Sequence, residues 1–117
     1  MKRNYESMVI LQPDLSDQDL ESIFDKIIKK IEELEGKVSD SKIWQKESNF
    51  HFFIQSRGAE KKKYYKGCYW LVNFSLEVSQ LPGLKELIRL EERILRSVII
   101  NREHKMKPKF IESGVQS

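Results

Sequence analysis

Apolar residues recur at helical spacing between Leu20 and Leu34, and this run constrains the fold more than any other part of the sequence. The apolar positions are Leu20, Ile23, Phe24, Ile27, Ile28, Ile31 and Leu34. Such spacing predicts an amphipathic helix with one buried face. Ser16, with Asp19 three residues later, resembles a capping box that begins the helix. Gly36, which tolerates a positive φ, is expected to end it.

The apolar face of this helix needs a second surface, which is predicted to be a sheet because β-branched and aromatic segments flank the helix. Strands are expected at residues 5–11, at 37–44 with a continuation at 49–55 after a bend or bulge, at 64–76 and at 93–101. Residues 56–63, which contain Gly58 and three consecutive lysines, are predicted to be a hairpin loop. Pro82 begins a second helix that extends to about Glu91.

Apolar residues occupy both alternating faces of residues 64–76, which favours a central strand. Cys68, Trp70, Val72 and Phe74 share one face, and Tyr69 and Leu71 share the other. The element order β-α-β-β-α-β is the split βαβ of the ferredoxin-like fold, in the α+β class, with two helices on one face of a four-stranded antiparallel sheet. The other face, left to water or a partner, would carry several aromatic side chains. Residues 1–102 are predicted to form this domain and residues 103–117 a basic, flexible C-terminal tail.

Charge is unevenly distributed along the chain, although the net charge is only +3. Acidic residues concentrate between residues 14 and 35, and basic residues at 57–66 and 102–109. This pattern predicts separate acidic and basic surfaces, as in proteins that bind polyanions. The alternative is that the lysines only keep loops and the tail solvated.

Cys68 is the single cysteine, so an intrachain disulfide or a cysteine-based metal cluster is excluded and a reducing compartment is indicated. Apolar runs stay shorter than the roughly 20 residues that cross a bilayer. The first residues enter a strand-like segment without the pattern of a signal peptide. We therefore expect no membrane association.

Residues of the kinds used in catalysis are present but are not grouped as a catalytic site requires. His51 alternates with large aromatics, His104 lies in the predicted tail, and Cys68 lies within a strand. Glu91 and Glu92 are adjacent at a turn and are expected to be solvated or salt-bridged. The phosphate-binding loop of a small ferredoxin-like enzyme such as an acylphosphatase does not follow the first strand. We expect no enzymatic activity, no cofactor, no metal and no small-molecule substrate.

The segment 66–73 invites comparison with the RNA-recognition motif, which has the same topology. Cys68 stands where a stacking aromatic is required, Tyr69 where Gly or Ala is required, and Asn73 at the eighth position. A single-stranded RNA-binding module of this type is therefore the alternative hypothesis rather than the first.

Three segments together resemble the family of the sixth protein of the bacterial small ribosomal subunit. They are residues 3–6 with the following strand and Pro13-Asp14, residues 66–74, and residues 84–100, especially 88–98. Their order and spacing cover residues 3–102. The second strand departs from the family pattern: Trp44 is kept, but Gln45 replaces a glycine and residues 50–54 replace a Leu-to-Ile run that includes a proline.

The resemblance implies a structural constituent of the ribosome, in the cytoplasm or in an organelle. Such a protein binds the central domain of small-subunit rRNA together with the eighteenth small-subunit protein during platform assembly. The contacts that the resemblance implies are Arg3, Tyr5, Lys66, Arg89, Arg93 and Arg96. Charge adds Lys2, Lys61, Lys62, Lys63, Lys105, Lys107 and Lys109, which are expected to touch phosphate without reading sequence.

Two of these contacts have structural alternatives. Tyr5 could be only a strand-packing aromatic, and Arg93 a cation that favours the end of a helix dipole. Arg96 lies inside a strand, where solubility alone explains it poorly, and a contact with RNA or the protein partner is the preferred interpretation.

Overall fold

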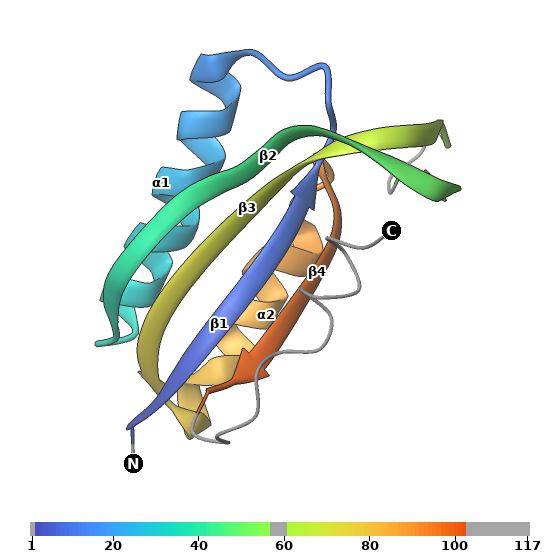
Figure 1. Ribbon diagram of the computed structural model, residues 1–117. Helices are drawn as coiled ribbons and strands as arrows, with labels where there is room; N and C mark the ends of the chain where they lie inside the picture. The colour runs from blue at the N-terminus through green and yellow to red at the C-terminus, as the bar shows by residue number, and fades with distance from the viewer. Residues whose placement is uncertain (1, 57–60, 103–117) are drawn as a thin grey trace.

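Four antiparallel strands and two helices alternate along the chain in the predicted β-α-β-β-α-β order (Figure 1). The computed structural model describes residues 2–56 and 61–102. The elements are β1 (Lys2–Leu11), α1 (Asp17–Glu33), β2 (Lys37–Gln55), β3 (Lys63–Glu77), a 3-10 turn (Val78–Gln80), α2 (Leu81–Leu90) and β4 (Ile94–Asn101). The strand order is β2-β3-β1-β4, so β3 is a central strand as predicted. The ferredoxin-like fold class is confirmed.

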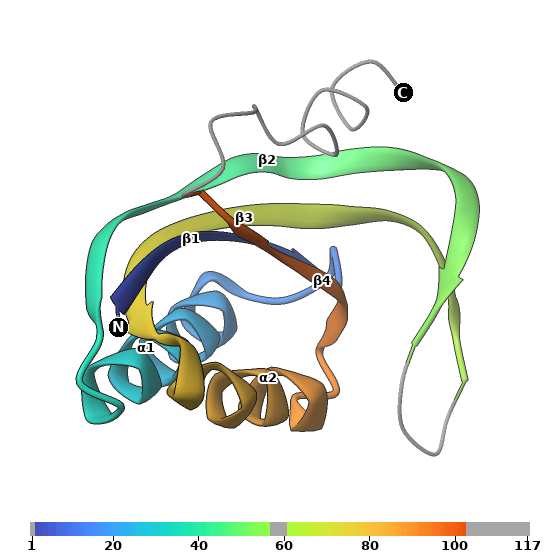
Figure 2. The same ribbon diagram turned by 90° about the horizontal axis from the view of Figure 1, so that it is seen from below.

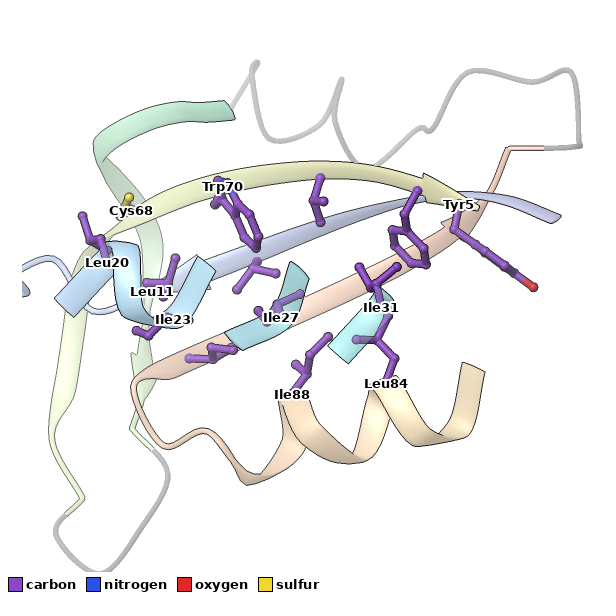
Figure 3. Close-up of a cluster of buried hydrophobic side chains, with 14 of the residues drawn as sticks. Tyr5, Leu11, Leu20, Ile23, Ile27, Ile31, Cys68, Trp70, Leu84 and Ile88 are labelled. Carbon is purple, nitrogen blue, oxygen red and sulfur yellow. The ribbon is translucent and has the colours of Figure 1, made fainter. Parts of the chain in front are cut away.

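The core lies between the sheet and the two helices, which cover the same face of the sheet (Figures 2 and 3). Trp70 from β3 is 1% exposed, and its ring stacks on Phe24 of α1 with the ring centroids 4.2 Å apart. Leu84 and Ile88 bring the apolar stripe of α2 into the same cluster. Each fully buried side chain of this size stabilises the fold by roughly 1.5–3 kcal/mol through the hydrophobic effect. This layer fixes which side chains of the sheet remain available on its second face.

The start of α1 matches the sequence prediction. The Ser16 hydroxyl oxygen accepts a hydrogen bond from the Asp19 backbone N–H at 3.1 Å. One orphan donor of the first helical turn is thereby satisfied.

The end of α1 differs from the prediction, because the residue with a positive φ is Glu35, at 66°, and not Gly36. The Gly36 N–H donates to the Ile31 carbonyl at 2.8 Å and the Glu35 N–H to the Glu32 carbonyl at 2.9 Å, which is a Schellman motif with Glu35 in the left-handed position. Gly36 is required for a different reason. A Cβ there would lie 2.6 Å from the Ser75 carbonyl oxygen and 2.8 Å from an Ile31 methyl.

The strand β2 continues without a break through the predicted bend, but its pairing with β3 changes register at four points between Val38 and Ile54. At 19 residues it is almost twice as long as β1, which has 10. The outer parts of β2 and β3 therefore extend past the helices as a projecting hairpin (Figure 2). The strand β3 begins at Lys63, one residue earlier than predicted, and residues 57–60 of the predicted hairpin loop lie outside the described residues.

Candidate nucleic-acid interface

Side chains on the second face of the sheet follow from the pairing register. Tyr69, Ile10 and Arg96 form one cross-strand row, and Leu71, Met8 and Val98 form the next. Met8 and Leu71, in the middle of this face, are buried, whereas Arg96 and Val98 on the edge strand β4 are exposed. The accessible part of this face is therefore its margin.

Aromatic rings gather on this face where the middle of β2 pairs with β3. The ring of Tyr69 meets Trp44 edge-on at 5.8 Å and Phe50 at 6.2 Å. Gly67 makes room for this arrangement, because a Cβ there would lie 2.7 Å from the tip of the Phe50 ring. The pKa of Tyr69 is raised by burial, and the side chain of Ser48 opposes that shift. The expected aromatic face is thus present, but its rings pack on one another.

The predicted RNA contacts do not form one cluster. Lys2 and Arg3 lie at the start of β1, at the end of the sheet opposite to the hairpin that carries Lys61, Lys62 and Lys63 (Figure 1). Lys105, Lys107 and Lys109 lie outside the described residues.

At the β1 end, Arg102 joins Lys2 and Arg3. Its N–H donates to the Asn4 carbonyl at 2.7 Å, and its guanidinium donates to the Asn73 side-chain oxygen at 2.8 Å. The Asn73 amide in turn donates to Asp40 at 2.8 Å. Arg102 was absent from the predicted contacts, although the charge run that begins at this residue could have indicated it.

Tyr5 is 5% exposed, and its ring stacks on Phe74 with centroids 5.6 Å apart (Figure 3). It also borders a cavity of about 320 Å³ that is lined by Asn4, Ser39 and Arg102 among others. The strand-packing interpretation therefore accounts for the ring, and a contact of Tyr5 with RNA stays a prediction.

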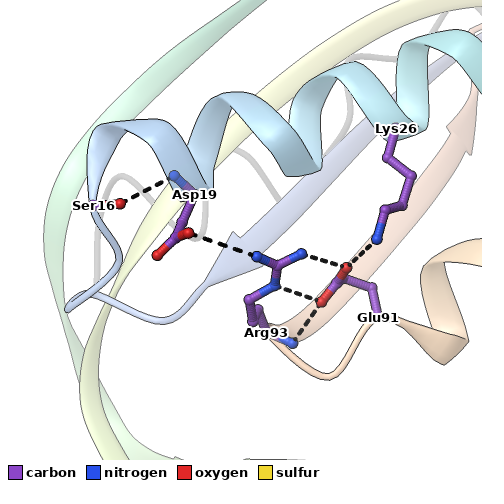
Figure 4. Close-up of polar contacts among 5 residues, drawn as sticks. All are labelled: Ser16, Asp19, Lys26, Glu91 and Arg93. Atoms are coloured by element: carbon purple, nitrogen blue, oxygen red, sulfur yellow. Dashed lines mark hydrogen bonds and ion pairs between the residues drawn. The ribbon is translucent and has the colours of Figure 1, made fainter.

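Arg93 is half-buried and belongs to a network of polar contacts that joins the α2–β4 turn to α1 (Figure 4). Its Nε donates to Glu91 Oε2 at 2.8 Å and its Nη2 to Glu91 Oε1 at 3.0 Å, and Nη1 lies 4.0 Å from Asp19. Lys26 adds an ion pair to Glu91 at 3.0 Å. These partners lower the pKa of Glu91 from 4.5 to about 2, chiefly through the hydrogen bonds from Arg93.

Arg93 therefore links Glu91 to Asp19 of α1, which is a structural role. This role differs from both sequence-based interpretations, the RNA contact and the cation at a helix end. A contact of Arg93 with RNA stays a prediction. The expected salt bridge is present at Glu91, whereas its neighbour Glu92 is exposed.

The remaining cations differ in how they are paired. Arg89 forms an ion pair with Glu86 on α2, which raises the pKa of Arg89. The Lys66 Nζ lies 3.2 Å from Oε1 of Glu47. Arg96 is exposed and forms no ion pair with any residue in the described part of the chain. Among the predicted arginines, Arg96 is thus the best placed to receive a phosphate or an acidic side chain.

Two hydrogen bonds between Ser56 and Lys62 join the two strands at the end of the hairpin. The Ser56 N–H donates to the Lys62 carbonyl at 2.8 Å, and the Lys62 N–H donates to the Ser56 hydroxyl at 2.9 Å. Lys63 places its ammonium 4.7 Å from the centre of the Phe53 ring, and Phe53 meets Tyr65 at 6.2 Å. These two aromatics were not among the predicted contacts.

The described residues do not bring together the side chains that a metal site or a reactive thiol would need. Within residues 2–56 and 61–102, no three His, Cys, Asp or Glu side chains lie close enough to hold a metal ion. Cys68 is buried, and burial raises the pKa of its thiol. Among the described helices, none is long and apolar enough to cross a membrane.

Comparison with known proteins places this geometry in context. The model of a family described as "Ribosomal protein S6" matches residues 4–101. The "Small ribosomal subunit protein bS6" of Dictyoglomus turgidum is 30% identical over 97 residues, which are 83% of this chain and 92% of that protein. The protein of the same name from Carboxydothermus hydrogenoformans is 30% identical over 103 residues, which are 88% and 99% of the two chains.

A solved structure gives the same picture of the fold. The crystal structure of the 30S ribosomal protein S6 of Thermotoga maritima superimposes with a TM-score of 0.77, covers 100% of both chains and is 24% identical. At that identity, the likeness concerns the fold alone.

Proposed function

This chain belongs to the ribosomal protein S6 family, and we propose that, as a structural constituent of the small ribosomal subunit, it binds the central domain of the small-subunit rRNA together with the eighteenth small-subunit protein. Its family is one of ribosomal structural proteins, and the chain is not an enzyme. A place in the ribosome of the cytoplasm follows from the same proposal.

The observation that carries the proposal is the extent of the family match. It runs from residue 4 to residue 101 and thus spans all four strands and both helices. A match of that extent concerns the whole domain rather than one motif. The altered second strand lies inside the matched range, so its divergence is a change within the family.

The charges support a binding mode based on phosphate contacts at more than one place. Lys2 and Arg3 lie at one end of the sheet, Arg96 lies on the edge strand β4, and Lys61 and Lys62 lie on the hairpin. Helix α1 carries six acidic residues against three lysines and would repel a polyanion. RNA would therefore approach the sheet side and its two ends, and bind largely through shape and phosphate.

The second face of the sheet is the preferred surface for the protein partner. Its margin presents Arg96 beside the exposed apolar side chain of Val98. An apolar residue next to a cation that forms no ion pair within the described residues suits a protein surface with an acidic side chain at its rim.

Binding to a transcript of the central domain, with and without the eighteenth small-subunit protein, tests the proposal. The complex should weaken steeply between 50 and 200 mM salt (roughly 100-fold or more if several phosphates are contacted). Arg96→Gln should weaken the complex, whereas Lys29→Gln on α1 is a matched control that should bind as wild type. A chain that ignores this RNA under all of these conditions would refute the proposal.

The alternative, a single-stranded binder of the RNA-recognition type, finds less support in the fold. Of the two aromatics whose replacement tests it, Trp70 is buried against Phe24 and has no free ring face for a base, whereas Phe52 is 81% exposed. Loss of RNA binding on Trp70→Ala would therefore report unfolding rather than stacking.

A further inference from the structure

The outer parts of β2 and β3 form a hairpin that extends past the helical layer (Figure 2), and this hairpin carries three exposed aromatic side chains. Phe52 is 81% exposed, Tyr65 63% and Phe53 44%. Rings of this size usually supply core or interface contacts, and here neither helix covers them. Their exposure therefore indicates an interaction surface.

Two of the rings form a unit on one side of the hairpin. Phe53 and Tyr65 lie on neighbouring strands with ring centroids 6.2 Å apart and planes inclined by 58°. Lys63 covers one side of the Phe53 ring at 4.7 Å. Tyr65 is the more exposed ring, so Phe53 supports it from the side and Tyr65 presents the free face.

The third ring lies outside this unit. Phe52 is the most exposed of the three rings, and within the described residues it makes no ring contact with Phe53 or Tyr65. Two separate exposed aromatic groups on the same hairpin can therefore be tested against each other.

The charged residues around the rings indicate which class of ligand the hairpin could bind. Lys61, Lys62 and Lys63 are exposed next to them, and Lys66 follows within the same strand. Between Phe50 and Ser56 and between Lys61 and Lys66 there is no acidic residue, although Glu60 precedes Lys61 in the sequence and Glu47 pairs with Lys66. An aromatic platform beside the exposed Lys61 and Lys62 suits a base with its phosphates better than an apolar protein groove, because base stacking and phosphate neutralisation are the two contributions to single-strand binding.

We propose that the β2–β3 hairpin binds an unpaired nucleotide of RNA, with the base stacked on Tyr65 and the adjoining phosphates contacted by Lys61 and Lys62. The inference rests on the proposed function, since the rRNA would supply that nucleotide. It goes further by naming a base-stacking subsite outside the body of the fold.

The test compares the dissociation constants of variants for the central-domain transcript with the eighteenth small-subunit protein present. Tyr65→Leu keeps an apolar side chain but removes the ring, and should weaken binding about tenfold. Tyr65→Phe should bind as wild type, and Phe52→Leu is the matched control at an exposed ring outside the Phe53–Tyr65 unit. Equal unfolding midpoints for the variants would show that the fold is intact.

Two further measurements distinguish stacking from other contacts. Lys61→Gln combined with Lys62→Gln should lower the slope of log K against log salt by about 1.5, whereas the same pair of changes at Lys29 and Lys30 should leave it unchanged. Ultraviolet crosslinking of the wild-type complex should attach RNA to the peptide that contains Tyr65.

Several results would overturn the inference. Wild-type affinity of Tyr65→Leu, or a greater loss with Phe52→Leu, would rule out stacking on Tyr65. If Tyr65→Leu bound RNA normally but lost the protein partner, the hairpin would be a protein-docking element. If the wild-type chain did not bind the transcript, the proposed function would be refuted. The hairpin site would then be tested with a single-stranded oligouridine at low salt, where a tenfold loss of affinity on Tyr65→Leu would support it. Equal affinities of wild type and Tyr65→Leu for the oligouridine would refute the hairpin site as well.

Discussion

Replacing Glu91 by Gln should remove an electrostatic contribution to the stability of this domain that can be estimated from its pKa. The Glu91 side chain is 10% exposed and receives hydrogen bonds from Arg93 and Lys26 (Figure 4). Its pKa falls from 4.5 to about 2 in the folded protein. Because one pKa unit corresponds to about 1.4 kcal/mol, this difference amounts to roughly 3 kcal/mol in favour of the folded, ionised state.

Solvent reduces that figure, since the side chains of Lys26 and Arg93 are 47% and 32% exposed. We expect Glu91→Gln to lower the free energy of unfolding by about 2 kcal/mol at pH 7. Glu92→Gln is the matched control, because Glu92 is exposed and outside the network; it should change stability by less than about 0.5 kcal/mol.

The pH dependence gives the sharper measurement. The folded-state pKa of Glu91 lies below its unfolded value, so the stabilisation is present above about pH 4.5 and is lost as the pH falls toward 2. In urea titrations at several pH values, the difference between wild type and Glu91→Gln should be constant from pH 7 to 5 and shrink below that range. A difference that stayed the same at pH 3, or equal effects of the two substitutions, would refute this account of the network.

Four other substitutions or measurements test local features of the fold. Glu35→Gly should stabilise the domain by about 0.5–1 kcal/mol, because glycine adopts the positive φ of this position without strain. Gly36→Ala should destabilise it by roughly 2 kcal/mol, since the new methyl would lie 2.6 Å from the Ser75 carbonyl oxygen; thermal or urea unfolding measures both. Ser7→Ala should raise stability by about 1 kcal/mol, because the buried Ser7 hydroxyl has no hydrogen-bond partner in the described structure, and a lower urea midpoint would contradict this. Cys68 should resist thiol reagents in the folded protein and react at the rate of unfolding, because it is buried and its pKa is raised by burial.

Periodicity was enough to predict the elements of this fold and their order. The spacing from Leu20 to Leu34 and the alternation around Trp70 each reflect burial, and burial is what the structure shows at these positions. The end of α1 could not be assigned from residue type, because Glu35 and Gly36 are adjacent and either could take the left-handed position. Only the close approach of Ser75 on β3 decides between them, and that contact is absent from the local sequence.

The candidate site was predicted less completely, for a related reason. A basic residue in the sequence does not reveal whether it already has an acidic partner. Arg93 and Arg96 look alike three residues apart, yet one is held by Glu91 and the other is exposed. Tyr65 and Phe53 were missed because an aromatic in a strand is usually a core residue; the sign that they are exposed is that β2 is longer than the helices can cover.

The changing register of β2 bears on the tendency of this chain to aggregate. β2 is an edge strand and contains Phe50-His51-Phe52-Phe53-Ile54, a short, β-prone, uncharged segment of the kind that stacks into amyloid-like zippers. A straight edge would offer this segment to a second copy as a template. The register shifts bend the strand and break the regular row of backbone donors and acceptors. Irregular pairing, which weakens the sheet locally, would thus protect the chain against fibril growth before it is assembled with its partners.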